Sequence, residues 1–116
     1  TDSKNRRIAI FEAFRLSSLN KKVITEHLNK VSGYDAEALS PVFMVAYCDV
    51  KDFSTLTVGY HNFISKTDYT GYKKDCLAVI IDEESVTDNL WVCTETRLRG
   101  EREVMFCHFL LNMHCN

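Results

Sequence analysis

A group of polar and aromatic side chains near the middle of the chain is the best candidate for chemistry. It comprises Tyr47, Asp49, Tyr60 and His61, with Asp68 and Tyr69 further along. A carboxylate beside tyrosine and histidine can transfer protons or bind a small ligand. The same residue types are also common at strand ends and in turns. Tyr47, Asp49, Tyr60 and His61 are therefore expected either to line a small-molecule pocket, catalytic or merely binding, or to point into bulk water.

Two Cys–His neighbours near the C-terminus, Cys107-His108 and His114-Cys115, are the candidates for a metal site. On one strand, His108 and His114 would share a face but lie about 20 Å apart. Zinc ligands must lie within about 2.3 Å of a single ion. No metal and no cofactor is therefore expected. The chain also lacks a glycine-rich phosphate loop, a G-x-S-x-G elbow and an H-E-x-x-H pair, so no catalytic residue is assigned.

The overall composition is that of one folded globular domain, covering residues 1–116. The chain has 116 residues, of which 46% are hydrophobic and 26% are charged, and both fractions argue against disorder. The net charge of −2 lacks the basic excess that general nucleic-acid binding requires. No apolar run is long enough to span a bilayer, so no membrane is expected as a partner.

The cysteine content and the first residue give expectations about context. Five widely spaced cysteines are an odd number, which favours reduced thiols in an intracellular protein, cytoplasmic or nuclear. The alternative is two disulfides and one free thiol in a secreted protein. The first residue is threonine, not methionine, which suggests a domain cut from a longer chain, such as a regulatory domain.

The N-terminal third predicts helices and the C-terminal half predicts strands. Apolar residues at helical spacing predict helices over Ser3–Leu19 and Lys21–Val31, with Asn20 as a cap for the second. Val42–Tyr47 is a continuous apolar run whose periodicity fits either a buried strand or a short helix, and its β-branched and aromatic residues favour a strand. Thr55–Lys66 also predicts a strand, with Gly59 as a bulge.

The strongest strand pattern lies after residue 75. It predicts strands over Cys76–Asp82, Asn89–Arg99 and Glu101–Cys115, joined by turns at Glu83–Asp88 and at Gly100. Three strands with short connections form a β-meander. The predicted fold class is therefore α+β, with N-terminal helices packed on a curved antiparallel sheet that ends in a three-stranded meander.

Alternation along the last two strands predicts which face is the core. One face of the final strand is wholly apolar and is assigned to the core: Met105, Cys107, Phe109, Leu111 and Met113. The other face is too apolar for solvent, so it is expected to be an interface with a second copy or another protein. The residues predicted to form this interface are Trp91, Val104, Phe106, His108 and Leu110. The leading hypothesis is thus a non-enzymatic interaction or dimerisation module.

The order of these elements resembles the cone-shaped fold of the nuclear transport factor 2-like superfamily. The matching stretches are a helical pair over Ser3–Val31, a strand pair over Val42–Lys66, a short helix over Asp68–Lys74 and a meander over Cys76–Cys115. The resemblance implies a cavity between helices and sheet that could hold an acid/base pair, and dimerisation through the outer face of the sheet. It maps no catalytic residue onto this chain, and the closing strand of the family is missing after Asn116. The sensor domains of the PAS class are the competing fold.

Overall fold

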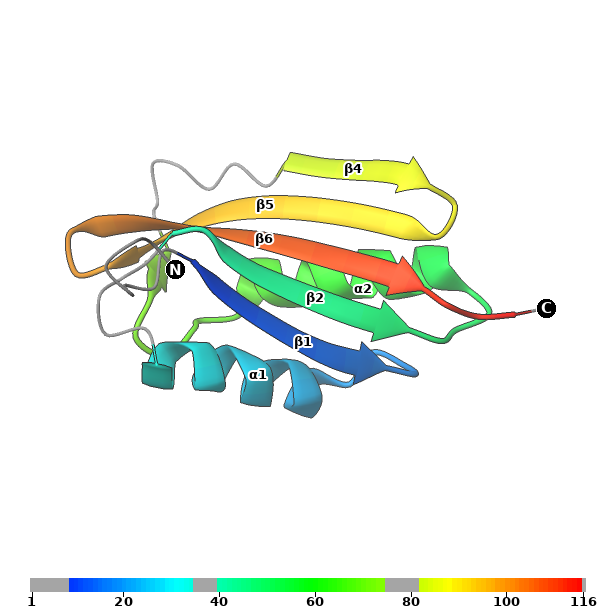
Figure 1. The fold of residues 1–116 in the computed structure, drawn as a ribbon, viewed down its shortest axis with the longest axis horizontal. Coiled ribbons are helices and arrows are strands. Elements are labelled where there is room, and N and C mark those ends of the chain that lie inside the picture. Colours follow the sequence, from blue (N-terminus) through cyan, green and yellow to red (C-terminus); the bar gives the residue numbers. More distant parts are fainter. Residues whose placement is uncertain (1–8, 35–39, 75–81, 116) are drawn as a thin grey trace, which may run out of the picture.

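The computed structural model describes residues 9–34, 40–74 and 82–115. Its elements follow in the order β1 (Ile10–Leu16), α1 (Lys21–Tyr34), β2 (Val42–Cys48), α2 (Phe53–Lys66), β3 (Lys73–Lys74), β4 (Asp82–Thr87), β5 (Leu90–Arg99) and β6 (Arg102–Asn112). The fold is α+β, as predicted. Figure 1 shows one layer of strands, with α2 behind the sheet and α1 running along β1.

The sheet is mixed, not antiparallel as predicted. Its strand order is β1-β2-β6-β5, and both β3 and β4 pair with the remaining edge of β5. β1 and β6 each run parallel to β2, whereas β5 and β6 form an antiparallel hairpin that turns at Gly100. Gly100 has a φ of 64°, a conformation that glycine adopts without steric cost. The meander prediction holds for β5 and β6, but its predicted first strand falls mostly on residues 75–81, outside the described residues. The turn predicted at Glu83–Asp88 is wrong, because Asp82–Thr87 forms β4 and pairs with β5.

The helix predicted over Lys21–Val31 is confirmed, and it continues to Tyr34 as α1. Ile24, Leu28 and Val31 are buried and recur at helical spacing, so one stripe of α1 packs on the core. The helix begins where predicted, because the Asn20 side-chain oxygen accepts a hydrogen bond from the Val23 amide at 3.2 Å.

The helix predicted over Ser3–Leu19 is wrong for the residues that the structure describes. Ile10–Leu16 forms β1, in which Ile10, Phe14 and Leu16 are buried and Phe11 is exposed. The sequence pattern of this short segment fits both a helix and a strand. Residues four apart, such as Ile10 and Phe14, lie on one face in either structure. Pairing with β2 decides between them, because every residue of β1 has a partner there.

The strand predicted over Thr55–Lys66 is also wrong, because Phe53–Lys66 forms α2. Its buried residues are Phe53, Leu56, Thr57, Tyr60 and Ile64, which recur every three to four residues. Asp52 caps the start, since its carboxylate accepts a hydrogen bond from the Thr55 amide at 3.1 Å. Gly59 is not a bulge but a point of close approach. A Cβ atom there would lie 2.9 Å from the Leu19 side chain.

These two reassignments change the element order that carried the family resemblance. The described chain begins with a strand where the resemblance requires a helix, and α2 replaces one member of the strand pair. The short helix expected over Asp68–Lys74 is also absent, because that described stretch consists of turns and β3. Membership of the nuclear transport factor 2-like superfamily stays a prediction.

The two faces of the sheet are assigned the other way round from the prediction. The side chains predicted to form an external interface are at most 2% exposed and lie in the core: Trp91, Val104, Phe106, His108 and Leu110. The face predicted as core is the outer one, on which Met105 and Met113 are 45% and 60% exposed. Both faces of β6 are apolar enough to form a core, so the hydrophobic pattern of the sequence alone could not show which face is buried. The two helices cover the face that also carries Glu95 and Arg97.

This assignment predicts opposite effects for two phenylalanine truncations. Phe106 is fully buried against the rings of Tyr69 and Tyr72, so Phe106→Ala should cost about 3–5 kcal/mol of unfolding free energy. Phe11 is 63% exposed, so Phe11→Ala should cost less than about 1 kcal/mol. Urea unfolding at low protein concentration measures both values. Equal losses, or a larger loss for Phe11→Ala, would reject the assignment.

Candidate functional site: the outer sheet face, a buried polar network and a hollow at the strand ends

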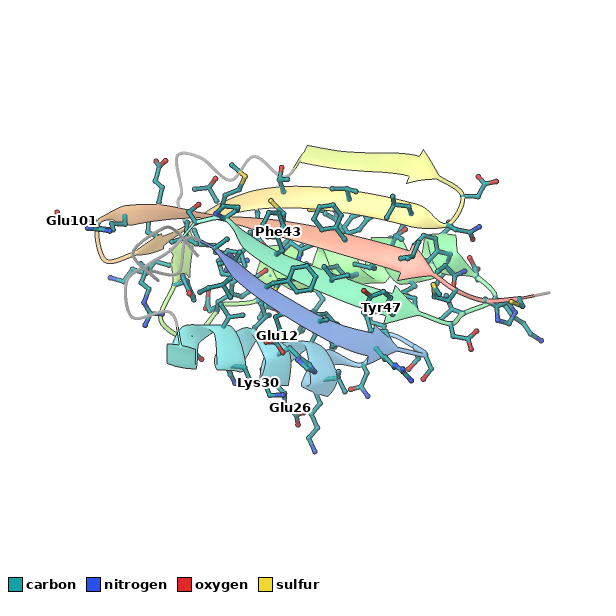
Figure 2. The ribbon with its side chains drawn as sticks, in the orientation of Figure 1. Glu12, Glu26, Lys30, Phe43, Tyr47 and Glu101 are labelled. Atoms are coloured by element: carbon teal, nitrogen blue, oxygen red, sulfur yellow. The ribbon has the colours of Figure 1, made fainter. Side chains whose placement is uncertain are left out.

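A row of aromatic rings crosses the outer face of the sheet. The rings of Phe11 and Phe43 lie 6.5 Å apart between centroids, and those of Phe43 and Phe109 lie 6.1 Å apart. The three residues come from β1, β2 and β6, so the row spans neighbouring strands. Figure 2 shows Phe43 and Tyr47 on the side of the sheet that faces away from α2. These distances lie within the range of favourable ring contacts.

The side chains around this row are apolar, and except for the buried Cys107 they are at least partly exposed. We define the outer patch as Phe11, Phe43, Val45, Tyr47, Met105, Cys107, Phe109 and Leu111. Phe11, Met105 and Tyr47 are 63%, 45% and 42% exposed. Along β1, β2 and residues 105–111 of β6, all of them described, the one outward-facing charged side chain is Arg15. A surface with aromatic and methionine side chains and few charges has the composition of an interface centre.

The inner face of the sheet holds a network of buried polar side chains under α2. The Tyr60 hydroxyl lies 2.7 Å from His108 Nδ1, and His108 Nε2 lies 2.6 Å from Glu95 Oε2. The Glu95 carboxylate only accepts hydrogen bonds, so His108 Nε2 carries a proton and donates it to Glu95. Tyr69 donates its hydroxyl to the same carboxylate oxygen.

Arg97 connects this network to the end of α2. Its Nε donates to Glu95 Oε1 at 2.6 Å, and its two Nη groups donate to the carbonyls of Ile64 and Thr67 at 2.7 and 2.8 Å. Carbonyl groups in the last turn of a helix have no partner within the helix. The guanidinium also lies over the Tyr69 ring, with its carbon 3.5 Å from the centroid. The charged Arg97 side chain on β5 therefore caps the C-terminal end of α2 from the interior of the protein.

The environment of Glu95 keeps it ionised. Burial raises the pKa of its carboxyl, but the hydrogen bond and charge of His108, the charge of Arg97 and the Tyr69 hydrogen bond outweigh burial and hold the pKa below its usual value. Burial raises the pKa of Tyr60 and Tyr69 well above the usual value, so both stay neutral donors. Every buried polar side-chain atom of the described residues has a hydrogen-bond partner. The network is therefore saturated, and Glu95 and His108, both at most 3% exposed, are closed to substrates.

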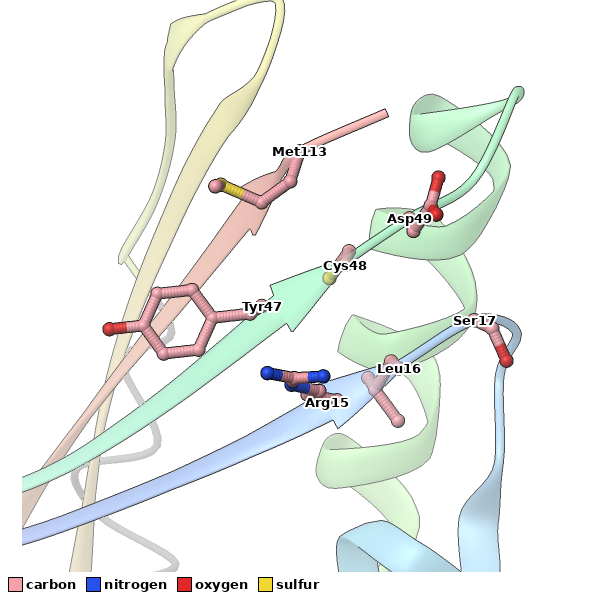
Figure 3. A pocket seen from close by; sticks show the side chains of 7 residues that line it. All are labelled: Arg15, Leu16, Ser17, Tyr47, Cys48, Asp49 and Met113. Carbon is pink, nitrogen blue, oxygen red and sulfur yellow. The ribbon is translucent and has the colours of Figure 1, made fainter. Parts of the chain in front are cut away.

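A hollow of about 620 Å³ lies at the carboxyl ends of β1 and β2. It is lined by Arg15, Leu16, Ser17, Tyr47, Cys48, Asp49 and Met113 (Figure 3). Backbone hydrogen bonds continue past the strands here, since the Asp49 amide donates to the Leu16 carbonyl at 3.0 Å and the Met113 amide to the Cys48 carbonyl at 2.7 Å. Ligands of open sheets with parallel strands commonly bind at this end.

Half of the predicted pocket residues meet at this hollow. Tyr47 and Asp49 line it, but Tyr60 and His61 do not. Tyr60 is in the buried network, and the His61 ring packs against Trp91 with centroids 6.3 Å apart. Placing Tyr60 and His61 on a strand, when they belong to α2, caused this error. The sequence analysis missed Arg15 and Ser17 because it placed them at the end of a helix.

The described residues contain no group of three or more histidine, cysteine or acidic side chains that could hold a metal ion. Cys48, Cys107 and Cys115 are free thiols, and Cys76 lies outside the described residues. Burial raises the pKa of Cys48 to about 11, so its thiol in the hollow stays protonated and is a poor nucleophile. Neither helix in the described part of the chain has the length and apolar character needed to cross a membrane.

Comparison with known proteins adds no family. The chain matches no protein-family model, no curated protein and no solved structure. Functional inference therefore depends on the outer patch, the buried network and the hollow.

The buried network predicts a large effect of neutralising Glu95. Glu95→Gln leaves the buried Arg97 charge without its carboxylate, so we expect a loss of about 3–5 kcal/mol in unfolding free energy. The matched control is Glu101→Gln in the exposed β5–β6 turn, which should change stability by less than about 0.5 kcal/mol. Urea unfolding at neutral pH provides the measurement. Similar small effects for both variants would show that the network is not stabilising.

The lowered pKa of Glu95 also predicts a pH dependence. A carboxyl whose pKa is lower in the folded state stabilises fully above its unfolded pKa, here about 4.5, and loses this contribution as the pH falls through the folded value. The stability difference between the wild-type protein and Glu95→Gln should therefore be constant near neutral pH and shrink below about pH 4. Unfolding curves of both proteins across this range test it. A difference that stays constant down to about pH 2 would contradict the lowered pKa.

Proposed function

We propose that this chain is a non-enzymatic interaction module that forms a homodimer by packing its outer patch against the same patch of a second copy. The observation that carries the proposal is the apolar, charge-poor row of side chains centred on Phe11, Phe43 and Phe109. Removing such side chains from water is favourable by about 25 cal/mol per Å². A second copy packed on this face of the sheet removes these side chains from water.

Face-to-face packing of two copies suits the geometry of this patch. Aligned sheets pack about 10 Å apart with interdigitating side chains, which the alternating outward residues of β2 and β6 provide. The patch residues themselves carry no charge, and the charged side chain at their rim is Arg15. A two-fold axis requires this kind of self-compatible surface.

The size of the patch sets the expected affinity. Strands about 4.8 Å apart and about 23 Å or longer give β1, β2 and β6, which carry the patch, a face on the order of 350 Å². Two copies would then bury about 700 Å², which is the size of a weak, transient interface. The dimer should therefore be reversible and depend on protein concentration.

Light scattering coupled to size-exclusion chromatography, under reducing conditions and from about 1 to 500 µM, tests the proposal. The wild-type mass should approach twice 13.4 kDa as the concentration rises. The double variant Phe11→Glu/Met105→Glu should stay monomeric, because it places two charges in the patch at positions that are exposed in the single chain.

The control is Val58→Glu, which adds a charge at a 56% exposed apolar residue on α2, away from the outer patch. This variant should dimerise like the wild type. A wild-type protein that is monomeric at every concentration would exclude the homodimer. A dimer that survives the double variant would exclude this face as its interface.

The hollow at the strand ends supports a second candidate function, the binding of a small molecule. Tyr47 and Asp49 are among the residues that line it. Its thiol is protonated, and the histidine and glutamate of the buried network do not line it. These features favour binding over acid/base catalysis.

A further inference from the structure

The hollow carries two opposite charges with unused binding capacity. The guanidinium of Arg15 makes no hydrogen bond or ion pair with the rest of the described chain. Asp49 uses one carboxylate oxygen, which lies 2.6 Å from His114 Nδ1, and its second oxygen has no partner among the described residues. Because His114 donates to Oδ1, it orients the carboxylate and leaves Oδ2 available to a ligand.

The wall between these charges is apolar and fixed in place. Leu16, Cys48 and Met113 line it, and the Tyr47 ring stands beside Arg15 on the neighbouring strand (Figure 3). The segment that carries Asp49 is anchored by Asn112. Its side chain accepts from the Val50 amide at 3.2 Å and donates to the Val50 carbonyl at 3.0 Å. This anchoring fixes the backbone beside Asp49, which lowers the entropy lost there when a ligand binds.

The charges select one class of ligand. A simple anion on Arg15 would be repelled by Asp49, and a simple cation on Asp49 would be repelled by Arg15. Arg15 pairs with Tyr47, two residues before Asp49, so the α-carbons of Arg15 and Asp49 are about 8 Å apart. A ligand whose ammonium and carboxylate groups are about 3 Å apart reaches both side chains through two ordinary hydrogen bonds.

We propose that this hollow binds a small zwitterion, namely a free α-amino acid with an apolar side chain. The ligand carboxylate pairs with the planar fork of Arg15, and the ligand ammonium donates to Asp49 Oδ2. The apolar side chain packs against Met113 and the Tyr47 ring. The site does not depend on the homodimer, although Tyr47 belongs to the outer patch as well.

The test uses L-leucine and two analogues that each lack one charge. N-acetyl-L-leucine has no ammonium, and 3-methylbutylamine has no carboxylate. In isothermal titration calorimetry at neutral pH, L-leucine should bind saturably, and each analogue should bind at least about tenfold more weakly. Arg15→Gln and Asp49→Asn should each weaken L-leucine binding by about tenfold or more.

Matched controls lie in the exposed β5–β6 turn, at the opposite end of the sheet. Arg102→Gln and Glu101→Gln remove the same kinds of charge there and should leave L-leucine binding unchanged. Amide NMR spectra of all variants establish that each is folded. Absence of saturable binding of L-leucine up to about 10 mM would overturn the proposal. Equal binding of N-acetyl-L-leucine would also overturn it, since the site would then recognise a plain anion.

The same samples separate this proposal from the homodimer. Light scattering reports whether the protein is a dimer, and calorimetry reports whether it binds L-leucine. A monomer that binds L-leucine supports the zwitterion site and rejects only the homodimer. A dimer that does not bind L-leucine supports the homodimer and rejects the zwitterion site.

Discussion

The buried ion pair between Glu95 and Arg97 is the interaction on which the arrangement of helix and sheet depends. Both residues point inward from β5, so a strand that packs under α2 places two charges in the core. Burying a charge costs several kcal/mol unless it is paired and hydrogen-bonded. Here Glu95 receives hydrogen bonds from Arg97, His108 and Tyr69, and Arg97 supplies the last carbonyls of α2 with donors. Any sliding of α2 along the sheet would break several of these bonds together, so the network fixes the position of the helix as well as its end.

This use of the inner face determines where the chain can function. The inner face is filled by apolar side chains and by a polar network in which each buried atom has a partner among the described residues. A saturated network has no donor or acceptor left for a substrate, and nearly complete burial excludes water. In the part of the chain that the structure describes, the outer patch and the carboxyl ends of β1 and β2 both keep exposed surface. The outer patch exposes apolar side chains, and the strand ends carry charged groups with unused hydrogen-bonding capacity.

The sequence predicts some levels of this structure better than others. The α+β class, α1 with its Asn20 cap, β2 and the β5–β6 hairpin all follow from strong local patterns. The structures of Ile10–Leu16 and Phe53–Lys66 do not follow from local patterns. Ile10–Leu16 is a short aromatic segment whose apolar spacing fits both a helix and a strand. In Phe53–Lys66 the β-branched residues favour a strand, although the apolar residues recur at helical spacing. The reversed faces have a different cause. β6 is apolar on both sides, and Glu95 and Arg97 on β5 look like solvent-facing residues until their partners Ile64, Thr67 and His108 are brought to them. A buried charge is recognisable only in three dimensions, because each of its partners lies at least 13 residues away, except for the neighbouring member of the pair.

The parallel pairing of β1 with β2 links the two proposed activities. Because both strands end at the same edge, Arg15 and Asp49 become neighbours, although they are far apart in the sequence. The same pairing aligns Phe11 with Phe43 at the other end of the strands, on the same face. One register therefore produces an apolar surface and, at its rim, a pair of opposite charges. Tyr47 borders both, being 42% exposed on the outer patch and lining the hollow. A second copy packed over the patch would therefore meet the rim of the hollow at Tyr47.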